Sequence, residues 1–147
     1  LSTKHARSVL PEQVPMSDAV YNLSRSSVLV AALMSGRFEL IKEAMQDKLH
    51  QPYRAQLVPG MADILTNAPN HGALGVALSG AGPTMLALVD AESERKAELE
   101  NFFIDTLQSF QIPSNVLWLN PAACGVETLT SDDESCTFID RLKGVRT

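Results

Sequence analysis

Aromatic residues and long apolar runs are both scarce in this chain. Only 5% of its 147 residues are aromatic, so the core must be built mainly from aliphatic side chains and Met. No apolar run approaches the length of about 20 residues that a membrane-spanning helix requires. The amino terminus has neither a signal-peptide pattern nor an initiator Met. We therefore expect a cytoplasmic chain without a membrane segment. We also expect that this chain begins inside a longer protein.

Cysteine is also rare, and basic residues are outnumbered by acidic ones. Cys124 and Cys136 are too few to define a disulfide framework, and neither has Cys or His neighbours at zinc-ligand spacing. We expect two free thiols and no metal site. The net charge of -5 argues against a broad nucleic-acid or anionic-membrane surface. A local basic pocket for a small anion is still compatible with this charge.

The remaining composition is that of an ordinary globular domain. With 45% hydrophobic and 20% charged residues, the chain is long enough for one domain with one core. We assign that domain to residues 1–129. Residues 130–147 are a polar and acidic tail with a composition typical of mobile segments.

Apolar periodicity and turn residues predict the elements along the chain. We expect helices over 4–9, 19–35, 38–49, 60–67 and 92–110, and strands over 73–78, 84–89 and 116–119, the last extended by 125–126. The long helix has a cap at Ser17 or Asp18 and ends at Gly36. Pro52 is expected to stop the next helix. The apolar stripe of the long helix is expected to face inward: Val20, Leu23, Ser27, Val30, Ala31 and Met34.

This order of elements indicates the fold class. Strands with helices on one face form an α+β sandwich. The β-β-α-β order matches most of a ferredoxin-like unit, a two-layer sandwich with helices on one face of an antiparallel sheet. One strand is missing at the front of that unit, and its natural place is just before Leu1.

A glycine-rich loop joins the two central strands. Its residues are Ser79, Gly80, Ala81 and Gly82, followed by Pro83 and Thr84. Glycines allow tight turns and close approach of a ligand, and exposed N–H groups in such a loop can bind an anion. No Lys-Ser/Thr pair follows, so the loop is not a P-loop, and it does not open a helix as a dinucleotide fingerprint does.

Two further segments bring arginines to defined positions. Thr3 and Arg7 are four residues apart, on one face of a helix if the segment is helical. Arg54 follows Pro52 and Tyr53 in a stretch that begins at Asp47. A guanidinium presents a planar fork suited to a carboxylate. Further polar residues near these segments are second candidates for a site: Asn22, Arg25, Asp47 and His50.

Together the three segments carry a resemblance to a known family. S-T-K-x-A-R at 2–7, D-x-x-x-x-P-Y-R at 47–54 and L-S-G-A-G-P-T at 78–84 occur in the order seen in homoserine kinases. These enzymes belong to the galactokinase, homoserine kinase, mevalonate kinase and phosphomevalonate kinase (GHMP) superfamily. The glycine loop resembles the third signature of that superfamily, and the two arginine segments point to homoserine kinase within it.

The resemblance implies transfer of a phosphoryl group from ATP, with Mg, to L-homoserine, on the way to threonine. Thr3, Arg7 and Arg54 match the family's substrate contacts, and the loop from Ser79 to Gly82 matches the segment that lines the active site. The resemblance also implies an amino-terminal domain as partner, and a homodimer. No catalytic residue is identifiable in this chain.

The family's nucleotide-binding segment, a glycine- and serine-rich loop, has no counterpart in this sequence. We therefore expect the chain to be the substrate-side half of such an enzyme and to be inactive alone. One alternative is another small-molecule kinase of the superfamily, although neutral sugars give no use for two carboxylate-binding arginines. The other alternative is a non-catalytic ferredoxin-like module that binds a ligand.

Overall fold

A computed structural model of the chain describes residues 1–122 and 125. Its first compact unit comprises Leu1–Val116. The strand extension predicted at 125–126 reaches beyond the described residues. Both cysteines, the predicted boundary at residue 129 and the tail 130–147 also lie outside them.

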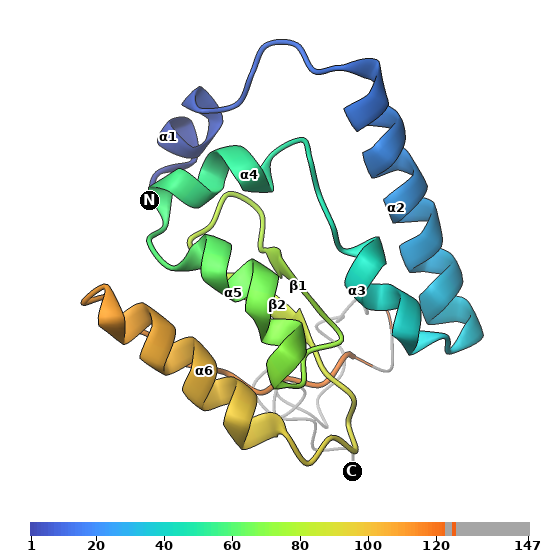
Figure 1. Cartoon of the computed structure of the whole chain (residues 1–147), viewed down its shortest axis with the longest axis vertical. Coiled ribbons are helices and arrows are strands. Elements are labelled where there is room, and N and C mark those ends of the chain that lie inside the picture. The colour runs from blue at the N-terminus through green and yellow to red at the C-terminus, as the bar shows by residue number, and fades with distance from the viewer. Residues whose placement is uncertain (123–124, 126–147) are drawn as a thin grey trace, which may run out of the picture. The chain divides into compact units, whose positions relative to one another are not determined.

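Helices predominate in the described unit (Figure 1). The α-helices are α1 (Thr3–Ser8), α2 (Met16–Ser35), α3 (Ile41–Ala44), α4 (Gln51–Arg54), α5 (Met61–Asn67) and α6 (Lys96–Ser109). Short 3-10 helices connect some of them: η1 (Phe38–Leu40), η2 (Ala55–Leu57) and η3 (Ala68–His71). The strands are β1 (Gly75–Leu78) and β2 (Met85–Leu88).

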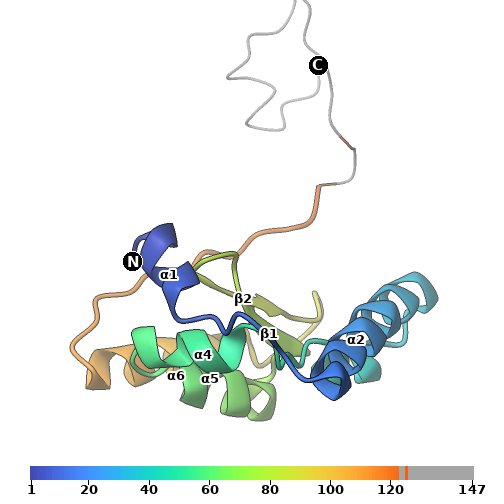
Figure 2. The same cartoon turned by 90° about the horizontal axis from the view of Figure 1, so that it is seen from above.

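The two strands form the predicted antiparallel hairpin, which pairs Gly75 with Leu88 and Leu78 with Met85. Helices α4, α5 and α6 lie on one side of this hairpin (Figure 2). The α+β class is therefore confirmed. Layering of this kind arises because each strand buries one apolar face and needs helices to cover it.

Aliphatic side chains fill the space between the hairpin and the helices. One buried cluster joins α5 and α6 to β1: Ile64, Ala68, Ala73, Val76, Leu99 and Leu107. A second cluster, made of Val58, Met61 and Leu78, lies beneath the end of β1 where the glycine loop begins. The loop is therefore attached directly to a packed part of the core.

Helix α2 begins earlier than predicted. It starts at Met16 after Pro15, three residues before the expected start, and neither Ser17 nor Asp18 serves as its cap. Asp18 instead forms an ion pair with Lys48 at 3.6 Å. Gly36 ends the helix with φ of 68°, as predicted.

The stripe of α2 that was expected to face inward faces outward. Val20, Leu23, Val30 and Met34 are 57%, 70%, 63% and 84% exposed. The helix contacts α3 and η1 through its other face, where Ala32 is fully buried. The prediction was wrong because both faces of α2 are apolar, and periodicity alone does not indicate which one meets this unit.

The segment 38–49 is not one helix. It is helical only through η1 and α3, and α4 starts at Gln51, with Pro52 in its first turn. Proline fits there because the N–H groups in the first turn have no acceptor within the helix, so the N–H that proline lacks is not needed. Deeper in a helix the proline ring would clash with the preceding turn. Pro52 therefore begins α4, and the prediction that it stops the preceding helix was wrong.

Residues 116–119 do not form the predicted strand. Among the described strands, β1 and β2 pair only with each other. Strand geometry depends on hydrogen bonds to a neighbour, and apolar sequence cannot supply that neighbour.

In the described part of the chain, no helix is long and apolar enough to cross a membrane.

Candidate functional site

Helix α1 presents Thr3 and Arg7 at the molecular surface. The Ser2 hydroxyl accepts a hydrogen bond from the backbone N–H of His5 at 3.2 Å, which fixes the start of the helix. Ala6 is fully buried and anchors the helix from below. Thr3 and Arg7, one turn apart, are exposed on it.

Arg54, at the end of α4, connects α1 with the glycine loop. Its Nε donates to the carbonyl oxygen of Ala6 at 3.2 Å, and its Nη1 donates to the carbonyl oxygen of Gly80 at 2.7 Å. The three segments singled out in the sequence therefore meet at one guanidinium. Figure 1 shows α1, α4 and the β1–β2 connection at the same end of the molecule.

The glycine loop is a tight turn with its own internal hydrogen bonds. The N–H of Ser79 donates to the carbonyl oxygen of Thr84 at 2.8 Å, and the N–H of Gly82 donates to that of Ser79 at 3.0 Å. Gly80 and Gly82 have φ angles of 58° and 79°, and the Gly82–Pro83 peptide bond is cis. Glycine suits both positions because other residues rarely adopt positive φ.

The arginines of the described chain fall into two groups. Arg25, Arg37 and Arg95 each form an ion pair with a glutamate, at 3.6, 2.8 and 2.7 Å respectively. Arg7 and Arg54 form no ion pair with a carboxylate within the described residues. These two guanidiniums are the ones that the sequence indicates for an anionic ligand.

Asp47, Asn22 and His50 form a separate polar cluster before α4. The Asp47 carboxylate accepts hydrogen bonds from the Asn22 amide at 2.5 Å and from the N–H groups of Leu49, His50 and Gln51. The His50 ring nitrogen Nδ1 also lies 3.0 Å from it. This arrangement fixes the turn that leads into α4 and thereby positions Arg54.

The Asp47 side chain is only 6% exposed, and it is held in its charged form. Burial alone raises the pKa of this carboxyl, but the hydrogen bonds from Asn22 and from the three backbone N–H groups outweigh burial and lower its pKa. A carboxylate with so many donors is poorly suited to accept a substrate proton. The geometry supports a positioning role for Asp47.

Arg25 lies in the contact between α2 and α3. Its guanidinium is 3.6 Å from Glu43 and lies over the Tyr21 ring, 4.4 Å from the ring centre. These contacts place Arg25 beside Asn22 on α2 rather than with Arg54 and the loop. Within the described residues Arg25 thus forms no ion pair with the segments that meet at Arg54, whereas Asp47 contacts the start of α4 through the N–H of Gln51.

Sequence analysis missed Gln51. Its side chain is 6% exposed, and its Oε1 accepts a hydrogen bond from the Leu78 N–H at 2.7 Å. Gln51 lies inside the Asp47–Arg54 segment, but nothing in a short polar stretch indicates that one amide will be buried against a strand. Only the tertiary structure reveals this contact.

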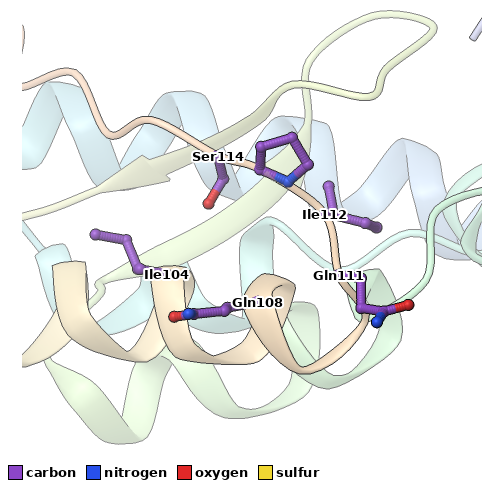
Figure 3. A pocket seen from close by; sticks show the side chains of 6 residues that line it. Ile104, Gln108, Gln111, Ile112 and Ser114 are labelled. Carbon is purple, nitrogen blue, oxygen red and sulfur yellow. The ribbon is translucent and has the colours of Figure 1, made fainter.

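Neither of two cavities on the described surface contains the predicted substrate contacts. One, of about 410 Å³, lies between the end of α6 and the segment that follows it, and has no charged side chain (Figure 3). The residues that line it are Ile104, Gln108, Gln111, Ile112, Pro113 and Ser114. The other, of about 450 Å³, lies beside α4 and includes Asp47 and Gln51. Thr3, Arg7, Arg54 and the glycine loop line neither of these cavities.

Comparisons with known proteins identify the family of this chain. The profile described as "GHMP kinases C terminal" matches residues 29–105, just over half of the chain. The chain belongs to this family. A homoserine kinase of Desulfitobacterium hafniense is 47% identical over 120 residues, and one of Persephonella marina is 47% identical over 104 residues. The crystal structure of a homoserine kinase from Cytophaga hutchinsonii superposes with a TM-score of 0.71 at 33% identity.

These relatives are longer than this GHMP kinase domain. The aligned parts cover 82% and 69% of the present chain, but only 40% of the D. hafniense protein and 35% of the P. marina protein. The C. hutchinsonii comparison covers 78% of this chain and 36% of that one. The described domain thus corresponds to little more than a third of each relative.

Proposed function

We propose that the protein to which this domain belongs is an ATP-dependent homoserine kinase, and that this chain is its substrate-side half. The reaction transfers a phosphoryl group from ATP to the side-chain hydroxyl of L-homoserine and yields O-phospho-L-homoserine and ADP. The observation that carries the proposal is that Arg7 and Arg54 alone among the described arginines form no ion pair with a carboxylate. The relatives named homoserine kinase support the choice of substrate.

Homoserine carries a carboxylate, which is the group that a guanidinium fork binds best. Arg54 keeps its Nε and Nη1 on the carbonyl oxygens of Ala6 and Gly80, and this fixes the plane of the guanidinium. Its remaining terminal nitrogen, together with Arg7 and the Thr3 hydroxyl, can then hold the amino-acid end. Phosphoryl transfer depends mainly on such positioning and on charge stabilisation.

The glycine loop is proposed to line the active site beside the bound substrate. Gly80 has no side chain, and open space lies where its Cβ would be, so a ligand can approach the backbone closely. The internal hydrogen bonds of the loop use the N–H groups of Ser79 and Gly82. The N–H of Gly80 and that of Ala81 have no such partner within the loop.

The residues of this chain do not fit the binding of ATP and Mg by themselves. The described residues contain no cluster of three or more acidic, His or Cys side chains that could hold a metal ion. The sequence also lacks the family's nucleotide-binding loop. We therefore assign ATP and Mg to an amino-terminal domain of the same protein. We also expect that protein in the cytoplasm and, from the resemblance to homoserine kinases, as a homodimer.

The test is an assay of the full-length protein with ATP and L-homoserine. Replacing Arg7 or Arg54 by Ala removes one charged hydrogen-bonding group, which contributes about 1.5–3 kcal/mol. We expect kcat/KM for homoserine to fall roughly ten- to hundred-fold in either variant. Activity should be measured well below the unfolding temperature of each protein, so that lost folding is not mistaken for lost binding.

Arg37→Ala is the matched control, because Arg37 is exposed and already paired with Glu39 at 2.8 Å. Its loss should leave kcat/KM unchanged, since exposed ion pairs contribute little. Absence of homoserine phosphorylation by the wild-type protein would contradict the proposal. Equal behaviour of the Arg7, Arg54 and Arg37 variants would contradict the assignment of the substrate contacts.

A further inference from the structure

Judged by the exposure of the whole residue, Gln51 and Thr106 are the two buried polar residues of the described chain. Burying an amide is unfavourable unless its polar atoms find partners. The Oε1 of Gln51 has such a partner in the N–H of Leu78, at 2.7 Å. Leu78 is the last residue of β1, and the glycine loop begins at the next residue.

The N–H of Leu78 is directed away from β2. In an antiparallel pair, successive N–H groups of a strand alternate between its two edges. The N–H of Ser79 donates to Thr84 across the hairpin, so that of Leu78 points to the outer edge of β1. Gln51 occupies the position at that edge where a neighbouring strand would otherwise accept the hydrogen bond.

The same short helix also carries Arg54. Arg54 binds the carbonyl oxygen of Gly80 inside the loop, and Gln51 binds the backbone directly before it. The two ends of α4 are thus attached to the hairpin at Leu78, the end of β1, and at Gly80, two residues further along in the loop. Asp47 in turn accepts the N–H of Gln51 at 2.5 Å and fixes the start of α4.

We propose that Gln51 is a positioning residue for catalysis, because its side-chain amide sets the conformation of the glycine loop through the Leu78 N–H. This inference rests on the proposed kinase function, and it adds a residue that touches no substrate. Gln51 acts only on the backbone around the loop, and Arg7 is proposed to act only on the carboxylate, whereas Arg54 also binds the loop through the Gly80 carbonyl. Gln51 and Arg7 should therefore differ in their kinetic effects.

The test compares Gln51→Met and Gln51→Glu in the full-length protein. Met keeps the length and apolar stem of the side chain but cannot accept the hydrogen bond well, whereas Glu retains an oxygen acceptor at the same position. We expect Gln51→Met to lower kcat at least tenfold while KM for homoserine changes less than threefold. Gln51→Glu buries a charge but should still retain more of kcat than Gln51→Met, and a kcat of Gln51→Met equal to that of the wild type would overturn the proposal.

Thr106→Val is the control, because it alters the other buried polar residue, in α6. It should leave kcat, measured well below the unfolding temperature, unchanged. If Thr106→Val reduces kcat as much as Gln51→Met does, Gln51 acts only through general stability and the proposal fails.

Amide hydrogen exchange separates this inference from the proposed function. In Gln51→Met, the exchange of the Leu78 amide should accelerate at least tenfold, while that of Leu99 in α6 stays unchanged. A wild-type protein with no homoserine kinase activity would refute the proposed function, and the exchange result would still decide whether Gln51 holds the loop. Unchanged exchange at Leu78 would overturn the inference whatever the activity.

Discussion

At the scale of single residues, the two loop glycines have the same handedness but different surroundings. A Cβ at Gly82 would lie 2.9 Å from Cδ1 of Leu78, whereas a Cβ at Gly80 would meet no atom within 4 Å. Both have positive φ, which strains any residue with a side chain. Their roles in the fold can therefore be separated by the same substitution.

We expect Gly80→Ala to lower the free energy of unfolding by about 1 kcal/mol, the strain of a left-handed alanine. Gly82→Ala adds a clash with Leu78 to this strain, so its loss should be about 2–3 kcal/mol. Urea unfolding of the two variants beside the wild type measures the difference. Equal losses would show that Leu78 adjusts without cost.

The arginines show what residue types alone can and cannot predict. The sequence indicates Arg7 and Arg54 through their segments, but it does not reveal which arginines already have an acidic partner. Arg25 looked like a second candidate, and its pairing with Glu43 depends on the contact between α2 and α3. Such pairings are tertiary, so local spacing cannot supply them.

At the scale of elements, α4 is too short to be stable through its own hydrogen bonds. A helix of four residues has almost no internal bonding, so it depends on contacts from outside. Asp47 provides these at its start, and Arg54 and Gln51 provide them through the glycine loop. This dependence explains why apolar periodicity predicted one longer helix over 38–49 and missed α4.

We expect Asp47→Ala to lower the free energy of unfolding by about 2 kcal/mol at pH 7, because several backbone N–H groups lose their acceptor. The pKa of Asp47 is lowered by folding, so the unfolded chain binds more protons at acidic pH. The stability that the Asp47 charge contributes is therefore present above the unfolded pKa of about 3.9. It is lost as the pH falls through the lower pKa of Asp47 in the folded state.

Unfolding curves of the wild type and of Asp47→Ala from pH 7 to pH 3 test this expectation. The difference in unfolding free energy between the two proteins should shrink steadily below about pH 4. A difference that stays constant with pH would show that the Asp47 charge does not contribute to stability.

The hairpin was predictable, as were α5 and α6, which precede and follow it along the chain, because their signals are local. Two apolar runs around a glycine-rich turn define β1 and β2, and Gly36 ends α2 where expected. Whether 116–119 forms a strand could not be predicted from local sequence, because a strand needs the edge of a neighbouring strand to pair with. The inward face of α2 was mistaken for a similar reason, since both of its faces are apolar.

At the scale of the whole molecule, we propose that this domain binds the substrate and that another domain of the same protein binds the nucleotide. The D. hafniense relative extends well beyond the part that aligns with this chain, which covers 40% of it. We expect ATP with Mg to raise the unfolding temperature of the full-length protein and to leave that of the isolated 147-residue chain unchanged. Thermal unfolding with and without the nucleotide measures both.

Sodium sulfate at matched ionic strength is the control, because it shows how far anions in general shift the unfolding temperature by binding to Arg7 and Arg54. An ATP-specific shift in the isolated chain would contradict the proposal that another domain binds the nucleotide. A shift in neither protein would contradict the proposed use of ATP.

The position of Arg54 also has a consequence for how the domain folds. Its two hydrogen bonds join residues 48 and 26 positions apart along the chain. Contacts between distant positions require the closure of long loops, which slows their formation relative to local helices and turns. We therefore expect the three segments to come together late in folding, so that the proposed substrate site forms only as the core closes.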